Sequence, residues 1–482
     1  GLTLMALSLS ACGGSSDTAT TTPTTPTPTT PTATPVALSL ATTRDVLTAN
    51  DFTATADAVS ATATTLTAVD VIAEGTAGDA DVLTVTVADG VNVAAPASIT
   101  GIEVVNYDVS AFTVPSIDVD NIIAAEITVS NLQAGGATGA NVDNLNGTSN
   151  VTFGSGVTGT AEVALAAGSD STINAGSALT LTVTGVEDDG ASIIAAGTTD
   201  NINVQGTAAT TDAIAISAVG AVALDTNDGA GTGAIVEAVT LSGNGAAVTY
   251  TLDACDDLET ITFAGDQDVT LIAGAADVAT ETVTNTSTGV ATLQINDDGN
   301  ANLDLVATSV MIDIADTATA AATYTVANNA NVTVSSGGNV ITLDSDELTT
   351  GDETINLVVQ VDGGAGNAID VSDFEVVNLS TATPTTLTGD LNAEVVAGAT
   401  SVINLTGAVD LALDTATVAD SLNAAAYTGD ITMTVTAANL NELTLGSGDD
   451  SITVATGETA TIVGGAGTDS LLTAADMDGF TF

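Results

Sequence analysis

Positive charge is almost absent from this chain. Its 482 residues include one arginine, Arg44, no lysine and no histidine, against 60 aspartates and glutamates, for a formal net charge of -59. Phosphate contacts need cationic side chains, so the composition excludes nucleic acid and an anionic membrane surface as partners. Without histidine or lysine there is no ordinary general base near neutral pH and no nitrogen ligand for zinc. We therefore expect no enzyme and no small-molecule substrate, with glycoside hydrolysis by paired carboxylates as the remaining catalytic alternative.

Aromatic residues are scarce as well. They make up 2% of the chain, tryptophan is missing, and yet 45% of the residues are hydrophobic. A core must therefore be built from valine, isoleucine, leucine and alanine, which suits thin repetitive layers better than a bulky globular centre. Since the chain holds almost no cations to offset its acids, we expect salt or bound divalent metal to do so.

The first of the two cysteines, Cys12, lies in the segment Leu9-Ser10-Ala11-Cys12-Gly13, which directly follows an apolar run. This arrangement resembles the end of a bacterial lipoprotein signal peptide. The resemblance implies that residues 1–11 are a signal peptide remnant and that Cys12 is lipidated. It also implies a membrane tether through the N-terminal lipid, at the extracellular face of the bacterial cell envelope. Residues 12–36 would then hold the lipidated cysteine and a Thr/Pro-rich linker that favours an extended spacer. Cys255 is left without a disulfide partner, and we interpret it as structural.

From residue 37 to residue 440 the sequence has one uniform texture. Short alternating runs of valine, isoleucine, leucine and threonine are separated by glycine, asparagine and aspartate, as in residues 82–90. This alternation predicts β-strands throughout. Residues 53–65 are the one stretch whose composition also suits a helix.

A short pattern that begins with glutamate recurs at a constant interval of about 22 residues, which is the kind of period that repeat proteins show. It starts at Glu237, Glu259 and Glu281, and again at Glu353 and Glu375. A repeat of this length suits one coil of a solenoid, which buries its apolar side only when coils stack. We therefore predict an all-β fold, an elongated β-solenoid of the parallel β-helix or β-roll kind with coils of about 22 residues. Tandem β-sandwich domains are the alternative.

The glutamates of this pattern share strand parity with the apolar residues that follow them. Stacked carboxylates about 5 Å apart on an inward face would repel each other. We expect Glu237, Glu259 and Glu281 to lie at a corner instead, where they accept backbone N–H bonds or bind a cation.

Two glycine-rich segments near the C-terminus carry the most specific motif. Residues 445–453 fit eight of the nine positions of GGxGxDxUx, and residues 464–472 fit all nine. The segments resemble the nonapeptide repeats of RTX β-rolls, which implies that residues 441–482 bind Ca2+. The residues that the resemblance assigns to the metal are Gly446, Gly448, Asp449, Asp450, Gly465, Gly467 and Asp469. The spacing of the two segments matches one β-roll coil, which predicts that Asp450 and Asp469 lie on adjacent coils and share one ion.

The glutamate-led repeats, the near absence of lysine and the RTX-like turns together resemble bacterial S-layer and calcium-dependent surface-repeat proteins. The resemblance implies a secreted, calcium-stabilised structural protein of a coat or matrix, with copies of itself as partners. The lipoprotein-like start departs from that pattern and favours anchoring by lipid. The function we expect is therefore a lipid-anchored structural surface protein. The alternative is an adhesin-type rod that binds another cell or an extracellular polymer.

Overall fold

The structure is a computed structural model of the 482-residue chain. It describes residues 34–473 except 76–77, 111–112, 132–138, 148, 155, 158, 168, 170, 177–179, 187–190, 196–198, 207–211, 227–235, 256–257, 298, 316–320, 336–339, 346–352, 361–368, 384, 388–399, 414–418, 436–439 and 456–459.

The strands form five parallel sheets. Sheet I holds β1 (Ala37–Ser39), β3 (Ala58–Thr62), β5 (Val82–Ala88), β7 (Val104–Ser110), β10 (Glu126–Asn131), β12 (Asn150–Phe153), β14 (Ser171–Asn174), β16 (Ala191–Ala195), β18 (Ala213–Ala218), β20 (Ala238–Gly243), β22 (Thr260–Ala264) and β24 (Thr282–Asn285). Sheet II holds β2 (Val46–Thr48), β4 (Val71–Ala73), β6 (Ser98–Thr100) and β9 (Ile122–Ile123).

Sheet III runs along most of the chain. It holds β8 (Ser116–Asp118), β11 (Ala140–Leu145), β13 (Thr160–Leu165), β15 (Thr180–Thr184), β17 (Thr199–Gln205), β19 (Ala221–Asp225), β21 (Val248–Ala254), β23 (Val269–Ala273), β25 (Ala291–Ile295), β27 (Met311–Ile314), β29 (Ala330–Val334), β31 (Thr354–Val359), β33 (Val376–Thr381), β35 (Val402–Gly407), β37 (Ser421–Tyr427), β39 (Glu442–Thr444) and β41 (Thr461–Val463).

Two shorter sheets complete the fold. Sheet IV holds β26 (Ala301–Leu303), β28 (Ala322–Val326), β30 (Ile341–Ser345) and β32 (Ile369–Ser372). Sheet V holds β34 (Thr385–Leu387), β36 (Leu411–Leu413), β38 (Ile431–Val435), β40 (Ser451–Val454) and β42 (Ser470–Thr473).

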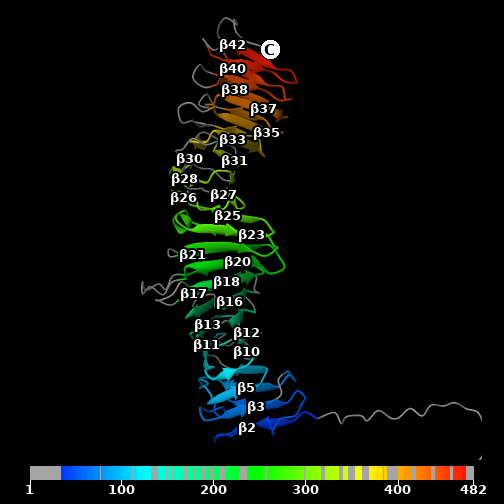
Figure 1. The fold of residues 1–482 in the computed structure, drawn as a ribbon, viewed down its shortest axis with the longest axis vertical. Coiled ribbons are helices and arrows are strands. Elements are labelled where there is room, and N and C mark those ends of the chain that lie inside the picture. The colour runs from blue at the N-terminus through cyan, green and yellow to red at the C-terminus, as the bar shows by residue number, and fades with distance from the viewer. Residues whose placement is uncertain are drawn as a thin grey trace, which may run out of the picture.

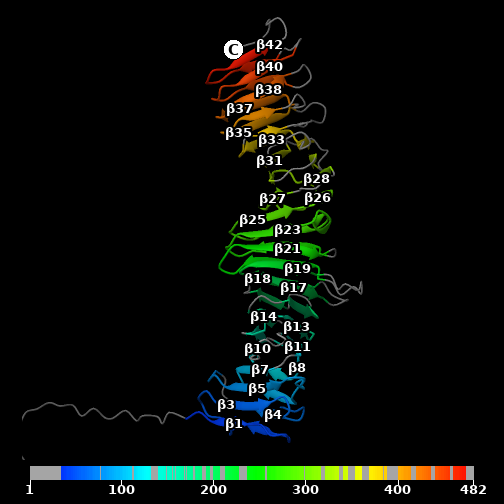
Figure 2. The ribbon, with the colours of Figure 1, turned by 180° about the vertical axis from the view of Figure 1, so that it is seen from behind.

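The chain winds into one long column of stacked coils, with β1 near one end and β42 at the other (Figures 1 and 2). From β10 onward each coil contributes one strand to sheet III and one to sheet I, IV or V. Within each sheet these strands pair in parallel with the strand two places further along the chain, as β20 does with β22. The fold is therefore a β-solenoid, as the sequence repeat predicts. No antiparallel pair of a β-sandwich occurs among the described strands.

The glutamate-led repeats stack in register. Val239 pairs with Ile261, and Ile261 pairs with Val283, both at the offset of the sequence repeat. Elsewhere the offset varies, because it is longer between the paired residues Val377 and Ile403 and shorter between Leu443 and Ile462. The strands keep a common register while the corners between them absorb the difference in length.

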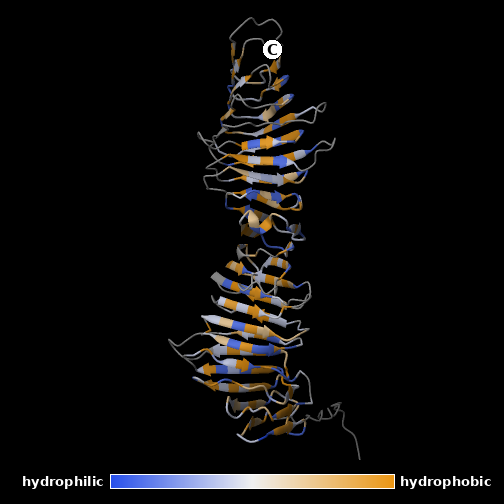
Figure 3. Cartoon of the chain, turned by 90° about the vertical axis from the view of Figure 1, so that its left-hand side faces the viewer, coloured by the Kyte–Doolittle hydropathy of each residue, from blue (hydrophilic) through white to orange (hydrophobic). Residues whose placement is uncertain are grey.

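The core is a set of apolar columns that run along the axis. Figure 3 shows hydrophilic and hydrophobic residues alternating along the strands, because successive side chains of a strand point to opposite faces. One column in sheet I is formed by buried residues that pair coil after coil: Val59, Leu83, Val105, Ile127, Val151, Ile173, Ile193, Ile216, Leu241 and Phe263. Each coil therefore buries its apolar face mainly against the coils above and below it.

The helix that residues 53–65 could also have formed does not occur in this segment. Residues 58–62 form β3, in which Val59 and Ala61 are buried and the other three residues are exposed. This strand pairs with β1 on one side and β5 on the other, so its backbone groups are bonded by neighbouring coils and not within a helix. Tertiary pairing thus outweighs the helix preference of an alanine-rich segment.

Helical structure is minimal in the part of the chain that the structure describes. It consists of one 3-10 turn, η1 (Ala276–Val278). No helix in this part is both long enough and apolar enough to cross a membrane.

Candidate calcium site

The two RTX-like segments form neighbouring corners of the column at its C-terminal end. The first connects β39 to β40, and the second connects β41 to β42. Since β39 pairs with β41 and β40 with β42, the corners lie directly on one another. Ser451 pairs with Ser470, which places Asp450 beside Asp469 on adjacent coils.

Glycine is required where the backbones of these corners touch. The N–H of Ala466 donates to the carbonyl oxygen of Gly446 at 2.8 Å, which fixes the spacing of the two turns. A Cβ atom on Gly465 would lie 2.1 Å from that oxygen, and one on Gly467 would lie 2.1 Å from the oxygen of Gly448. Gly465 also has a φ of +80°, in the left-handed region that side chains disfavour. The motif glycines therefore have a steric role that does not depend on metal.

The aspartates of the motif bind backbone N–H groups of neighbouring coils. Oδ1 of Asp450 accepts from the N–H of Ile431 at 2.7 Å, and Oδ1 of Asp469 accepts from the N–H of Asp450 at 3.2 Å. Asp449 is exposed, and its Oδ1 accepts from the N–H of Thr468 at 2.8 Å. Asp450 differs from the other two because it is only 1% exposed and its Oδ2 is buried with no hydrogen-bond partner.

The acidic corner continues over two preceding coils that the sequence motif does not include. Oδ1 of Asp430 accepts from the N–H of Asp449 at 2.6 Å, and Oδ1 of Asp410 accepts from the N–H of Asp430 at 3.2 Å. The available signal was the near-regular spacing of Asp410, Asp430, Asp449 and Asp469 in the sequence. The corners of Asp410 and Asp430 do not fit the RTX-like pattern, so only the spacing of the aspartates points to them in the sequence.

The electrostatics of this corner favour a cation. Burial raises the pKa of Asp450, and the nearby carboxylates of Asp469, Asp430 and Asp449 raise it further, against the lowering effect of the Ile431 N–H. The side chains of these residues can supply only oxygen ligands, and Ca2+ prefers oxygen ligands. A bound divalent ion would offset the repulsion and would use the free Oδ2 of Asp450.

The structure does not gather the aspartates into a tight cage. Among the described residues, Asp449, Asp450 and Asp469 do not place one carboxylate oxygen each within 4.8 Å of one another. The Gly446 carbonyl is occupied by the Ala466 N–H. Calcium binding at these corners therefore stays a prediction.

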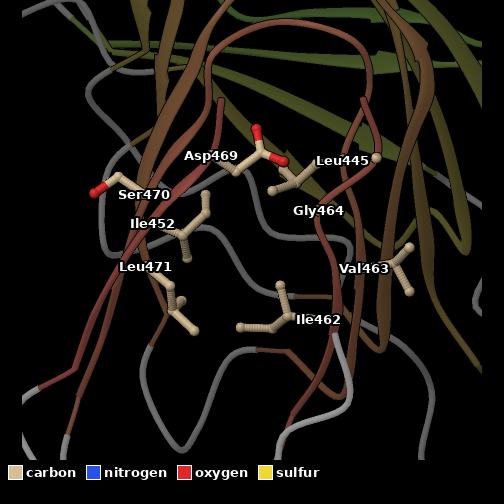
Figure 4. A pocket seen from close by; sticks show the side chains of 9 residues that line it. Leu445, Ile452, Ile462, Val463, Gly464, Asp469, Ser470 and Leu471 are labelled. Carbon is tan, nitrogen blue, oxygen red and sulfur yellow. The ribbon is translucent and has the colours of Figure 1, made fainter. Parts of the chain in front are cut away.

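A cavity of about 350 Å³ adjoins Asp469 at this end of the column. In Figure 4 the Asp469 carboxylate lies at one end of the cavity, with the apolar side chains of Ile452, Ile462 and Leu471 beyond it. These residues come from the last two coils that the structure describes. The cavity is a continuation of the core and offers little polar chemistry for a ligand.

The expected corner positions of the repeated glutamates are confirmed in part. Oε2 of Glu237 accepts from the N–H of Asp212 on the preceding coil at 2.6 Å. Oε2 of Glu281 accepts from the N–H of its neighbour Thr280 at 2.8 Å, while Glu259 is exposed. Glu237 therefore joins successive coils by a carboxylate-to-backbone bond, and Glu281 caps its own corner.

Of the two cysteines, the structure describes Cys255 but not Cys12. Cys12 lies outside the described residues, as does nearly all of the Thr/Pro-rich linker. Cys255 is buried and its Sγ donates to the Leu224 carbonyl oxygen at 3.4 Å. Burial raises the pKa of this thiol, so it is a poor nucleophile, in keeping with a structural role.

No protein-family model matches the chain, and no curated protein and no solved structure shows significant similarity to it.

Proposed function

We propose that the protein is a lipid-anchored, calcium-stabilised structural rod at the extracellular face of the bacterial cell envelope, part of an S-layer-like coat or matrix. The observation that carries this proposal is the continuous column of parallel coils that bears almost nothing but negative charge. A stack of hydrogen-bonded coils resists bending, because each coil is fixed to two others along its strands. Such a body suits a spacer or a lattice unit.

The charge explains how assembly can depend on calcium. Sixty acids and one arginine make copies of the chain repel one another at low salt. Divalent ions that bind at acidic corners reduce this repulsion and can bridge carboxylates of adjacent rods. Side-by-side association should then begin only above a threshold of calcium.

A calcium titration of the full chain, followed by light scattering, tests this proposal. We expect conversion from monomer to assembly with Ca2+, and no conversion with NaCl at the same ionic strength. Electron microscopy of cell envelopes then separates the roles: a periodic layer supports the coat, and isolated fibrils support the adhesin-type rod. A monomer at every calcium concentration would contradict the calcium-dependent coat.

Replacement of Cys12 tests the anchor separately. The C12S variant should leave the membrane fraction and appear in the soluble fraction, because a thioether-linked lipid needs the cysteine sulfur. Membrane association that persists in C12S would contradict lipidation at this residue.

A further inference from the structure

A second group of acids lies at the opposite end of the column from the RTX-like corners. Glu74 follows β4, and Asp79 and Asp81 precede β5, so all three belong to the corner that joins these strands. One carboxylate oxygen from each lies within 4.8 Å of one from each of the others. Glu74 is 9% exposed and Asp81 is completely buried.

Several oxygen atoms of this group have no partner. Both carboxylate oxygens of Asp79, and Oδ2 of Asp81, are shielded from solvent without a hydrogen bond. A buried carboxylate oxygen without a donor is costly, and here such oxygens belong to two aspartates that lie beside each other and beside the carboxylate of Glu74. The only basic residue of the chain, Arg44, is exposed.

The neighbouring Asp57 is a buried carboxylate whose two oxygens both have hydrogen-bond donors. Its Oδ1 accepts from the N–H of Val36 at 2.5 Å, and its Oδ2 accepts from the N–H of Thr53. Burial alone would raise the pKa of Asp57, yet these backbone donors outweigh it and the pKa is lowered. Asp81 has one such donor, the N–H of Asp57 at 2.6 Å, and burial raises its pKa to about 6.

The group is held in position by the next coil. Glu103, which precedes β7, accepts from the N–H of Gly78 at 2.7 Å through Oε1 and from the N–H of Asp81 at 2.8 Å through Oε2. With the bond from Asp57 to Asp81, three successive coils fix the corner around the free oxygens. Backbone hydrogen bonds therefore hold this corner in place without using the unpartnered oxygens of Asp79 and Asp81.

We propose that Glu74, Asp79 and Asp81 bind one Ca2+ ion at the N-terminal end of the column. Calcium binds oxygen ligands at about 2.3–2.6 Å, so two ligands on opposite sides of one ion are about 4.6–5.2 Å apart. One oxygen from each of the three residues lies within 4.8 Å of one from each of the others, so one ion can reach all three. The chemistry is all oxygen, and calcium's flexible coordination suits ligands from one irregular corner better than the strict octahedron of Mg2+.

This site has a role that differs from assembly of the rods. It would fasten the corner between β4 and β5, which is bonded to the coils of Asp57 and Glu103 on either side. It does not depend on the RTX-like corners or on the lipid anchor, so it can be correct even if both are wrong.

Calcium binding by the full chain, stripped with chelator and measured by isothermal titration calorimetry, tests the proposal. Asp79 is the residue to change, because neither of its oxygens makes a hydrogen bond that D79N would break. We expect D79N to bind one Ca2+ fewer per chain than the wild type. D266N, which neutralises an exposed aspartate on another corner, should bind as the wild type does. The double variant D450N/D469N should keep the N-terminal ion.

Thermal unfolding gives a second readout that separates lost binding from misfolding. Without calcium, D79N should melt at a higher temperature than the wild type, because it removes one of three repelling carboxylates. With calcium, D79N should gain less than the wild type gains. Equal calcium stoichiometry in D79N, D266N and the wild type would overturn the proposal. So would a D79N variant that melts lower than the wild type without calcium and gains as much with it.

Discussion

Buried carboxyl pairs make individual residues of the column sensitive to pH. Glu353 is 1% exposed and Glu375 is 4% exposed, and Oε2 of Glu375 accepts from the N–H of Glu353 at 2.9 Å. Oε1 of Glu353 is buried without a hydrogen bond. The adjacent Glu375 carboxyl and burial together raise the pKa of Glu353 above its ordinary value of 4.5.

The raised pKa of Glu353 fixes the sign of the pH effect. Its folded pKa is above its unfolded pKa, so the stabilisation by its proton is complete below pH 4.5 and is lost as pH rises through the folded pKa. E353Q is permanently neutral and should melt a few degrees above the wild type at pH 7, with a smaller difference at pH 4. E259Q, at an exposed position of the same repeat, is the control and should not change the melting temperature. A gain by E353Q that is the same at both pH values would contradict the assignment.

Glycine at position 465 avoids two separate costs: a clash with the neighbouring coil and a backbone angle that other residues disfavour. G465A would place a methyl group 2.1 Å from the Gly446 oxygen at a φ of +80°. G245A has a similar φ of +76° with nothing within 4 Å, so it isolates the cost of the backbone angle. We expect G245A to cost about 1 kcal/mol and G465A about 1–3 kcal/mol more, measured by denaturant unfolding. Equal costs would show that the corners of the two coils are not in contact.

At the scale of elements, sheet III carries a ladder of asparagines. Nδ2 of Asn378 donates to Oδ1 of Asn356 at 2.9 Å, Nδ2 of Asn404 donates to Oδ1 of Asn378 at 3.0 Å, and Asn423 continues the series at 3.3 Å. The four residues pair in register from β31 to β37. Identical amides can bond in this way only when coils stack in parallel without a shift.

Breaking the ladder in its middle should cost more than breaking it at its end. N378A removes two bonds of the ladder and should destabilise the protein by about 1–2 kcal/mol. N356A, at the end of the series, removes one and should cost about half as much. Urea unfolding of both variants checks this order. If N356A were as costly as N378A, the bonds of the ladder would not be the source of the loss.

A sequence pattern predicted the fold well where it was repeated along the chain and poorly where it occurred only once. The pattern after Glu237, Glu259 and Glu281 fixes both strand identity and spacing, and the strands that follow these residues pair at the expected offset. The segment 53–65 was ambiguous because alternating alanines fit a helix and a strand equally, and only pairing with distant coils decides between them.

The acidic sites were predictable to a smaller degree. The RTX-like corners were found because their glycines follow a known pattern, and the structure stacks them as their spacing predicts. The group around Asp81 has no sequence signature. Its acids come from one irregular corner, and what distinguishes them is burial without hydrogen-bond donors, which depends on the coils of Asp57 and Glu103.

For the whole molecule, charge density is the property that solution conditions should control most. A formal charge of -59 on one narrow column places many acids within the Debye length of one another at low salt. That length falls from about 30 Å at 0.01 M salt to about 3 Å at 1 M. The melting temperature of chelator-treated protein should therefore rise steadily with NaCl across this range, whichever acids bind metal.

Calcium should act beyond this screening if it binds at the proposed corners. Millimolar Ca2+ should raise the melting temperature more than NaCl of equal ionic strength, because coordination neutralises buried carboxylates such as Asp81 and Asp450 that screening by salt barely reaches. A variant that combines D79N with D450N and D469N should respond to NaCl as the wild type does but should lose most of the extra gain with Ca2+. Circular dichroism melts in the two salts measure both effects. If the extra gain were intact in this variant, calcium would stabilise the column through its exposed acids and not through these corners.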